Sequence, residues 1–235
     1  MNKKSLTSKY RGDFVEYLSL NNKQTSEYTE ILSDSRVYDI DNPIDDIHIK
    51  LGSSDNSGNT SMEKRELYDG IWLQRKLFKF LNTNHSDEVN DKNLHLIFTS
   101  KLIVTYGEKR YHARVVLTGT PSIISTSGLI EGPARPREYY WLKANFVQSG
   151  KDFSELDDLF ADRYLTYGDE RIANVLCSYT LQSIFYHYLG EQFCNNNSCS
   201  LYNSHWQEEV LSIHAKNIVC EDCQKKLDII CKLMN

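Results

Sequence analysis

The sequence predicts a mixed α/β or α+β protein, with a mixed sheet in the N-terminal and middle parts and helices in the C-terminal third. Two observations lead to this fold class. Segments rich in β-branched and aromatic residues gather between residues 94 and 118, and long segments with helical apolar spacing dominate after residue 153. Apolar residues make up 40% of the 235 residues and charged residues 25%, so the chain can bury a sizeable core.

The first part of the chain contains three candidate secondary-structure elements and one polar loop. The elements are a strand over 14–20, a helix over 26–32 and a strand over 45–51. Residues 52–62 are almost entirely Gly, Ser, Asn, Asp and Thr, a composition that predicts a flexible loop. We therefore expect an N-terminal α/β segment over 1–62 and a main domain over 63–235, with one continuous domain as the alternative.

The middle of the chain predicts a helix followed by strands. Residues 63–81 carry apolar side chains at the spacing of an amphipathic helix. Three strands are then expected over 94–99, 101–106 and 112–118. The turn Gly107–Arg110 is expected to join the last two as a hairpin, and Pro121–Gly128 predicts a further short strand.

Helices are expected to fill most of the remaining chain. They are predicted over 153–164, 169–189, 204–214 and 222–233. Gly190 suits the C-cap of the longest helix, because glycine adopts the left-handed conformation found there. Ser204 suits the N-cap of the next helix, with Gln207 three residues later completing a capping box.

Four cysteines near the C-terminus have the spacing of a closed metal site. The pattern is Cys194-x4-Cys199, a gap of twenty residues, and Cys220-x2-Cys223. Cysteines two to four positions apart in a turn can direct both sulfurs at one point, and four thiolates complete a tetrahedron around Zn²⁺. This pattern predicts a structural zinc knot over 194–223. Four free thiols, or two disulfides that each close a tiny loop, are the alternatives.

The other two cysteines lack a second close partner in the sequence. We expect Cys177 and Cys231 to be small core residues.

Histidines and carboxylates flank the first cysteine pair. His187 lies near the end of the longest predicted helix, and His205 is followed by Glu208 and Glu209 on the same helical face. These four residues are candidates for a catalytic site, with the histidines and one Glu as metal ligands and the other Glu as general base. A solvated first helical turn around His205, and a hydrogen-bonded core histidine at 187, are the alternatives. His112 is a weaker candidate.

Gly128–Trp141 reads as a loop stiffened by two prolines and rich in arginine and aromatic residues. Arg135 and Arg137 could bind an anion or stack on a base, while an ordered connection into a strand is the alternative. The formal net charge of −5 argues against general attraction to nucleic acid or anionic membranes.

The composition also gives expectations about compartment. The N-terminus is basic but has no following apolar run, so it does not resemble a secretory signal. No window approaches the length of a transmembrane helix. We expect a soluble cytoplasmic protein, a compartment in which clustered cysteines favour metal binding over disulfides.

The stretch from His187 onward resembles the C-terminal part of the archaemetzincins, a metallopeptidase family. Their pattern is His-Glu-x-x-His-x-x-Gly-x-x-His, followed directly by Cys-x4-Cys and about twenty residues later by Cys-x-x-Cys. Alignment on Cys194 places His187 on the middle histidine and Gly190 on the glycine. Here Ser183, Ile184 and Phe193 replace the first histidine, the general-base Glu and the third histidine; these three positions are the departures from the pattern. The resemblance implies the structural zinc but not the peptidase chemistry.

A longer stretch, from about Leu94 to Cys223, resembles an archaeal family grouped as candidate metallopeptidases. The similar segments are 94–99, 111–116, 121–126, 136–140 and 201–209.

Three hypotheses about function follow from the sequence. The chain is a zinc-binding protein with a degenerate peptidase centre that serves as a binding or scaffold module for a peptide or protein. Alternatively it is a metal-dependent hydrolase with a rebuilt site, or a nucleic-acid or nucleotide binder.

Overall fold

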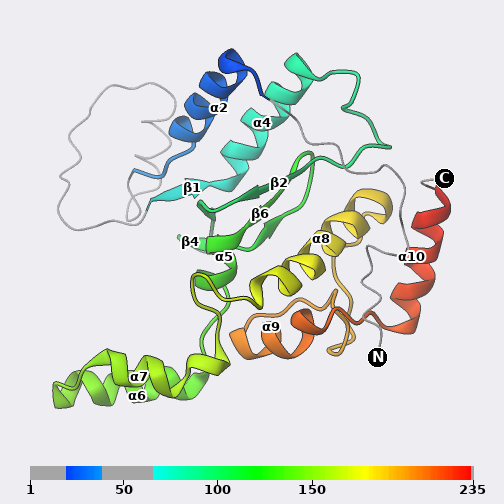
Figure 1. Cartoon of the computed structure of the whole chain (residues 1–235). Coiled ribbons are helices and arrows are strands. Elements are labelled where there is room, and N and C mark those ends of the chain that lie inside the picture. Colours follow the sequence, from blue (N-terminus) through cyan, green and yellow to red (C-terminus); the bar gives the residue numbers. More distant parts are fainter. Residues whose placement is uncertain (1–19, 39–65, 234–235) are drawn as a thin grey trace.

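The computed structural model describes residues 20–38 and 66–233. The expected mixed α/β fold class is confirmed: the strands lie in the N-terminal and middle parts, helices fill the C-terminal part, and the four cysteines gather there (Figure 1). The helices are α2 (Asn22–Asp34), α4 (Gly70–Asn84), α5 (Thr126–Glu131), α6 (Arg137–Ser149), α7 (Phe153–Leu159), α8 (Ile172–Leu189), α9 (Gln207–Ile213) and α10 (Glu221–Leu233), with 3-10 turns η1 (Ala161–Arg163) and η2 (His214–Lys216). The strands are β1 (Leu67–Asp69), β2 (Leu96–Thr99), β3 (Leu102–Gly107), β4 (Arg110–Arg114), β5 (Val116–Leu117) and β6 (Ser122–Ser125).

The strands of the described part form two three-stranded sheets, in the orders β1-β3-β4 and β2-β6-β5. β1 pairs with β3, and β2 with β6, in parallel, whereas β3–β4 and β5–β6 are antiparallel. The predicted hairpin between β3 and β4 is confirmed. Glu108 and Lys109 both have positive φ at its tip, which is the backbone of a type I′ turn.

The single strand expected over 112–118 is wrong, because the chain passes from one sheet to the other within it. Val116 pairs with Ile124 of β6, while Ala113 pairs with Val104 of β3. The short strand expected over 121–128 ends at Ser125, whose side chain accepts a hydrogen bond from the backbone N–H of Gly128 and thereby begins α5.

The helix expected over 63–81 begins later, at α4. Residues 67–69 instead form β1, because their backbone pairs in parallel with β3. Asp69 then accepts a hydrogen bond from the backbone N–H of Trp72 and caps α4. The helix expected over 26–32 lies within α2, which a capping box between Asn21 and Gln24 begins. The strand expected over 14–20 lies outside the described residues except for Leu20, and the expectations for 45–51 and 52–62 lie outside them entirely.

α8 is the central helix of the C-terminal part. Figure 1 shows α2 and α4 on one side of the strands and α8 with α9 on the other. The buried side chains of α8 come from most of the circumference of the helix, as expected of a helix covered on several sides. It begins three residues later than the prediction over 169–189, and Gly190 ends it with φ of 69°, which confirms the predicted C-cap.

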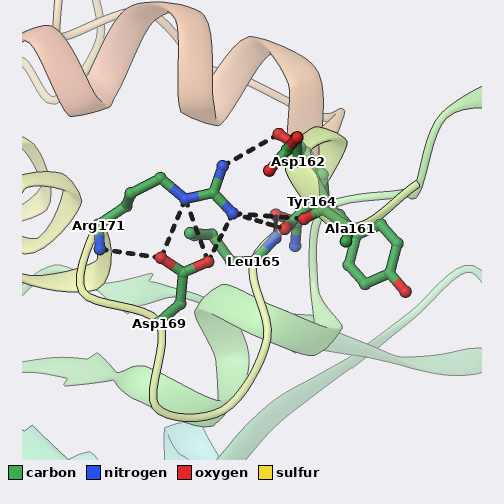
Figure 2. Close-up of polar contacts among 7 residues, drawn as sticks. Ala161, Asp162, Tyr164, Leu165, Asp169 and Arg171 are labelled. Atoms are coloured by element: carbon green, nitrogen blue, oxygen red, sulfur yellow. Dashed lines mark hydrogen bonds and ion pairs between the residues drawn. The ribbon is translucent and has the colours of Figure 1, made fainter. Parts of the chain in front are cut away.

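A salt bridge secures the entry to α8 (Figure 2). The guanidinium of Arg171 donates to both carboxylate oxygens of Asp169 and also to the backbone carbonyls of Asp162 and Tyr164. One side chain therefore ties the 3-10 turn η1 to the start of the long helix.

The loop expected over Gly128–Trp141 is largely helical. α5 occupies its first residues and α6 begins at Arg137, directly after Pro136, so only a short connection remains between them. Proline is compatible with a helix start because it needs no donor there. The helix expected over 153–164 is shorter: α7 ends at Leu159, and the separate 3-10 turn η1 follows at Ala161. Figure 1 shows α6 and α7 projecting together from the body of the protein.

The last two helices were predicted with different accuracy. α9 begins at Gln207 rather than near Ser204, whose hydroxyl instead contacts the ring Nε2 of His214 at 3.0 Å. α10 confirms the helix expected over 222–233 to within one residue. None of the helices in the described part combines the length and apolar character needed to cross a membrane.

Candidate metal centre

The four predicted cysteines converge on one point. Cys194 and Cys199 lie in the turn after α8, Cys220 directly precedes α10, and Cys223 lies in the first turn of that helix. All four sulfur atoms lie within 4.8 Å of one another. A zinc tetrahedron with bonds of ~2.3 Å has edges of ~3.8 Å. The Sγ atoms of Cys194 and Cys220 are 3.7 Å apart, so the arrangement fits Zn²⁺.

Backbone hydrogen bonds position the two cysteine pairs. The N–H of Cys194 donates to the carbonyl of Leu201 at 2.9 Å, and that of Cys199 donates to the carbonyl of Asn196 at 3.0 Å. Ser200 N–H donates to the carbonyl of Ile218 at 2.7 Å, which joins the first cysteine segment to the second. The intervening Asn-rich turn closes back on itself as its composition predicts.

Backbone N–H groups also point at the sulfurs. Asn196 N–H lies 3.4 Å from Cys194 Sγ, and Cys220 N–H lies 3.4 Å from Cys199 Sγ. The backbone N–H of Cys223 lowers the pKa of the Cys220 thiol. Such donors stabilise thiolates, the form that binds metal.

Burial has the opposite effect on the thiol pKa values of the two buried cysteines, Cys199 and Cys223. It raises the pKa of Cys199 and of Cys223, because a thiolate loses its hydration there. Two buried thiolates beside two others need a compensating positive charge. A divalent cation supplies it, so the donor set matches a structural zinc site.

The six cysteines all lie in the described residues, where they form no disulfide, and they differ in their surroundings. The metal-site cysteines pack into an apolar cluster with Phe185, Leu201 and Leu227 between α8 and α10. Cys231 is half-buried at the edge of the same cluster. The expectation that Cys177 is a core residue is wrong, because Cys177 is exposed on α8.

His187 lies in the last turn of α8. The main influences on its pKa are burial, which lowers it, and the backbone carbonyl of Asp91; His95 is a further neighbour. Its Nε2 is buried and has no hydrogen-bond partner among the residues that the structure describes.

The other three candidates form a helix start. His205 is exposed, and its backbone N–H donates to the carboxylate of Glu209 at 2.8 Å. Glu208 forms an ion pair with Arg163. Within residues 20–38 and 66–233, the four cysteines are the only group of three or more His, Cys, Asp or Glu ligand atoms that converge. Within the described residues, His187 therefore does not form a converging group of three or more ligand atoms with His205, Glu208 and Glu209, and the catalytic assignment stays a prediction.

Of the three positions that depart from the metallopeptidase pattern, two are packed within the protein and one is exposed. Ser183 is fully buried and its hydroxyl donates to the carbonyl of Tyr179 at 3.2 Å. Ile184 packs at the edge of the apolar cluster around the cysteines. Phe193 is 48% exposed beside Cys194.

The arginines of the 128–141 segment are engaged within the protein. The guanidinium of Arg135 lies 4.5 Å from the ring centre of Tyr139 and 4.2 Å from that of Tyr164, and it pairs with Asp157 at 3.1 Å. Arg137 lies over the ring of Trp206. These contacts hold the α6–α7 pair to the body.

Sequence reasoning missed a buried polar group that packs against α8. His214 is fully buried, stacks on Tyr179 at 4.9 Å, and burial lowers its pKa to about 4. Nothing in the local sequence marks this histidine, because its partners come from α8 and from the segment before α9.

Three comparisons with known proteins complete the description. The comparison with curated proteins gives no match. Among solved structures, the crystal structure of a zinc-dependent peptidase from Methanocorpusculum labreanum has a TM-score of 0.44 and 13% identity, over 88% of this chain and 92% of that one. The model of the "Probable metallopeptidase family (DUF6775)" matches residues 9–230. The chain therefore belongs to this probable metallopeptidase family.

Proposed function

We propose that this chain is an archaemetzincin-like, zinc-stabilised member of its family in which the peptidase centre is degenerate, and that it serves as a cytoplasmic binding or scaffold module. The observation that carries the proposal is the identity of three residues. They stand where the archaemetzincin pattern has two zinc-binding histidines and the general-base Glu. A buried serine at 183, an isoleucine at 184 and a phenylalanine at 193 offer neither an imidazole nor a carboxylate. A metzincin centre needs three imidazoles to hold zinc and a Glu to activate the bound water.

The two carboxylates that follow His205 already have other partners. Glu208 neutralises Arg163, and Glu209 accepts the backbone N–H groups of His205 and Trp206. Recruiting either one as a base would break an ion pair or a helix start. The cysteine site, in contrast, has its ligands already converged, which supports a structural role for the metal.

Metal analysis of the purified protein, with peptide hydrolysis measured in parallel, tests the proposal. We expect one zinc per chain, retained by His187→Ala and lost by Cys220→Ser, and no hydrolysis of a casein digest or of quenched fluorescent peptides. Two zinc ions per chain, or hydrolysis that a chelator abolishes and zinc restores, would overturn it.

A second candidate is a metal-dependent hydrolase with a rebuilt site. The buried Nε2 of His187 favours it, because this nitrogen has no hydrogen-bond partner within residues 20–38 and 66–233, and a neutral imidazole can offer a ring nitrogen to a metal. Under this alternative His187→Ala removes one equivalent of metal while leaving the zinc of the cysteines in place. His205→Ala and Glu208→Gln would then weaken the same metal, whereas the first proposal predicts that all three variants keep the wild-type metal content.

A further inference from the structure

A cavity of about 490 Å³ opens beside the cysteine cluster. Its lining comes from the end of α8, the turn that carries the first cysteine pair, and the start of α10. This volume exceeds that of a metal ion and lies within the ~300–1,000 Å³ typical of small-ligand pockets. The cavity is therefore large enough for one or two amino-acid side chains.

One wall of the cavity is apolar and open. Phe193, Phe185 and Leu201 all line the cavity; Phe193 is 48% exposed, whereas Phe185 and Leu201 are only 2% and 1% exposed. An aromatic or large aliphatic group placed against Phe193 would remove apolar surface from water. The cavity thus favours a ligand with an apolar side chain.

The rim of the cavity is acidic. Glu191, Glu221 and Asp222 line it together with a single cation, Lys226, so these side chains carry a net charge of −2. Lys226 already pairs with Glu191. Four thiolates around one Zn²⁺ add a further net charge of −2 beside the same space. The N-terminal dipole of α10 offsets only ~0.5 of a charge.

Lys225, which lies outside the cavity lining, only partly neutralises the carboxylates of Glu221 and Asp222. Lys225 lies 3.0 Å from Glu221 and 3.7 Å from Asp222, and all three side chains are more than 60% exposed. One ammonium shared by two solvated carboxylates gives weak pairing, since surface ion pairs contribute at most ~1 kcal/mol. A cationic ligand can therefore gain from this field.

We propose that this cavity binds a peptide segment that carries Arg or Lys next to an aromatic or large aliphatic residue. The apolar side chain lies on Phe193, and the cation lies against Glu221 and Asp222. The carboxamides of Asn195 and Asn196 also line the cavity, where such groups can donate to and accept from a peptide backbone. This inference rests on the proposed function, because it names the partner class of a binding module.

Calorimetric titration of the zinc-loaded protein with capped tetrapeptides tests the inference. The probe is acetyl-Gly-Arg-Phe-Gly-amide, and the matched peptides replace its Arg by Glu or its Phe by Ala. We expect sub-millimolar binding of the probe, weakened ~10-fold or more in either matched peptide and weakened further in 0.5 M salt. Phe193→Ala and the double variant Glu221→Gln, Asp222→Asn should each reduce the affinity ~5-fold or more.

Asp228→Asn is the control for the loss of an acidic side chain, because it removes one negative charge from the same helix outside the cavity lining. It should bind like wild type, and the zinc content of every variant should equal that of wild type. The inference is overturned if the probe does not bind, if the Glu peptide binds equally well, or if Asp228→Asn weakens binding as much as the rim variants. Cleavage of the probe would instead contradict the degenerate peptidase centre, so the two failures are distinguishable.

Discussion

The sulfur atoms of Cys194 and Cys220 lie 3.7 Å apart, although 26 positions separate the two residues in the chain. This contact joins the turn after α8 to the start of α10. Because α10 otherwise contacts the body through Leu227, Ile230 and the same apolar cluster, the metal centre and the packing of the last helix form one unit. Loss of the metal should therefore release more than a local loop.

Substitution of a buried ligand tests this dependence. Cys199→Ser should lose its zinc and roughly 3–5 kcal/mol of the free energy of unfolding, a part of the ~10–16 kcal/mol that structural zinc supplies in small domains. Metal analysis and urea unfolding, followed by tryptophan fluorescence, measure the two effects. Cys177→Ser is the control, since Cys177 is exposed and lies outside the cluster. If both variants had the same free energy of unfolding, the stability of the fold would not depend on the metal.

Gly128 allows α5 to approach β4 closely. A Cβ at this position would lie 1.9 Å from the carbonyl oxygen of Arg114, which is backbone and cannot move aside. Gly128→Ala should therefore destabilise the protein by about 3 kcal/mol or more, near the upper end of overpacking costs. Gly107→Ala is the matched control because its Cβ would meet no atom within 4 Å. Thermal unfolding of both variants measures the difference; similar melting temperatures would contradict the close approach.

The parts of the fold that the sequence predicts well have local causes. The C-cap at Gly190 and the hairpin tip at Glu108 and Lys109 each depend on a residue's own backbone preference or on a short turn. The cysteine site belongs to the same class, because each pair is brought together by a turn of a few residues.

The parts that were predicted wrongly depend on partners distant in the sequence. α6 is helical around Tyr139 and Phe146 because these side chains pack against α7, and its proline-flanked start resembles a loop when viewed alone. The strand after His112 divides because Val116 finds its partner in the other sheet. His187 and His205 flank the same cysteines in the sequence, yet α8 and α9 place them in different surroundings.

His214 should make the stability depend on pH. Burial lowers its pKa to about 4, so the folded protein holds it neutral while the unfolded chain protonates near its ordinary value of ~6.5. The unfolded state then binds more protons between these values, and stability present above pH ~6.5 is lost as the pH falls toward 4. Between pH 7 and pH 5 this group alone should cost about 2 kcal/mol.

Urea unfolding of wild type and His214→Gln at both pH values isolates this contribution. The variant should lose about 2 kcal/mol less than wild type over the interval, because glutamine does not titrate. Zinc content measured at both pH values shows whether the two proteins hold the metal equally. The same pH dependence in both proteins would contradict a neutral, buried His214.

Arg171 should stabilise the entry to α8 through the geometry of its guanidinium. Its Nε donates to Asp169 at 2.9 Å, while its other nitrogens donate to the carbonyls of Asp162 and Tyr164 at 3.0 and 3.1 Å (Figure 2). Arg171→Ala should cost about 2–3 kcal/mol, because it leaves a largely buried carboxylate at Asp169 without its partner.

Arg171→Lys shows whether the stability at the start of α8 depends on the positive charge alone or also on the shape of the guanidinium. Arg171→Lys keeps the charge but cannot reach both the carboxylate and the two carbonyls, so it should recover less than half of the lost stability. Hydrogen exchange should also speed up at residues 161–166 in both variants, since the 3-10 turn η1 loses its tie to the helix. Lys225→Ala, which removes an exposed ion pair, should change the stability by less than about 0.5 kcal/mol. Full stability in Arg171→Lys would show that a single positive charge suffices at the start of α8.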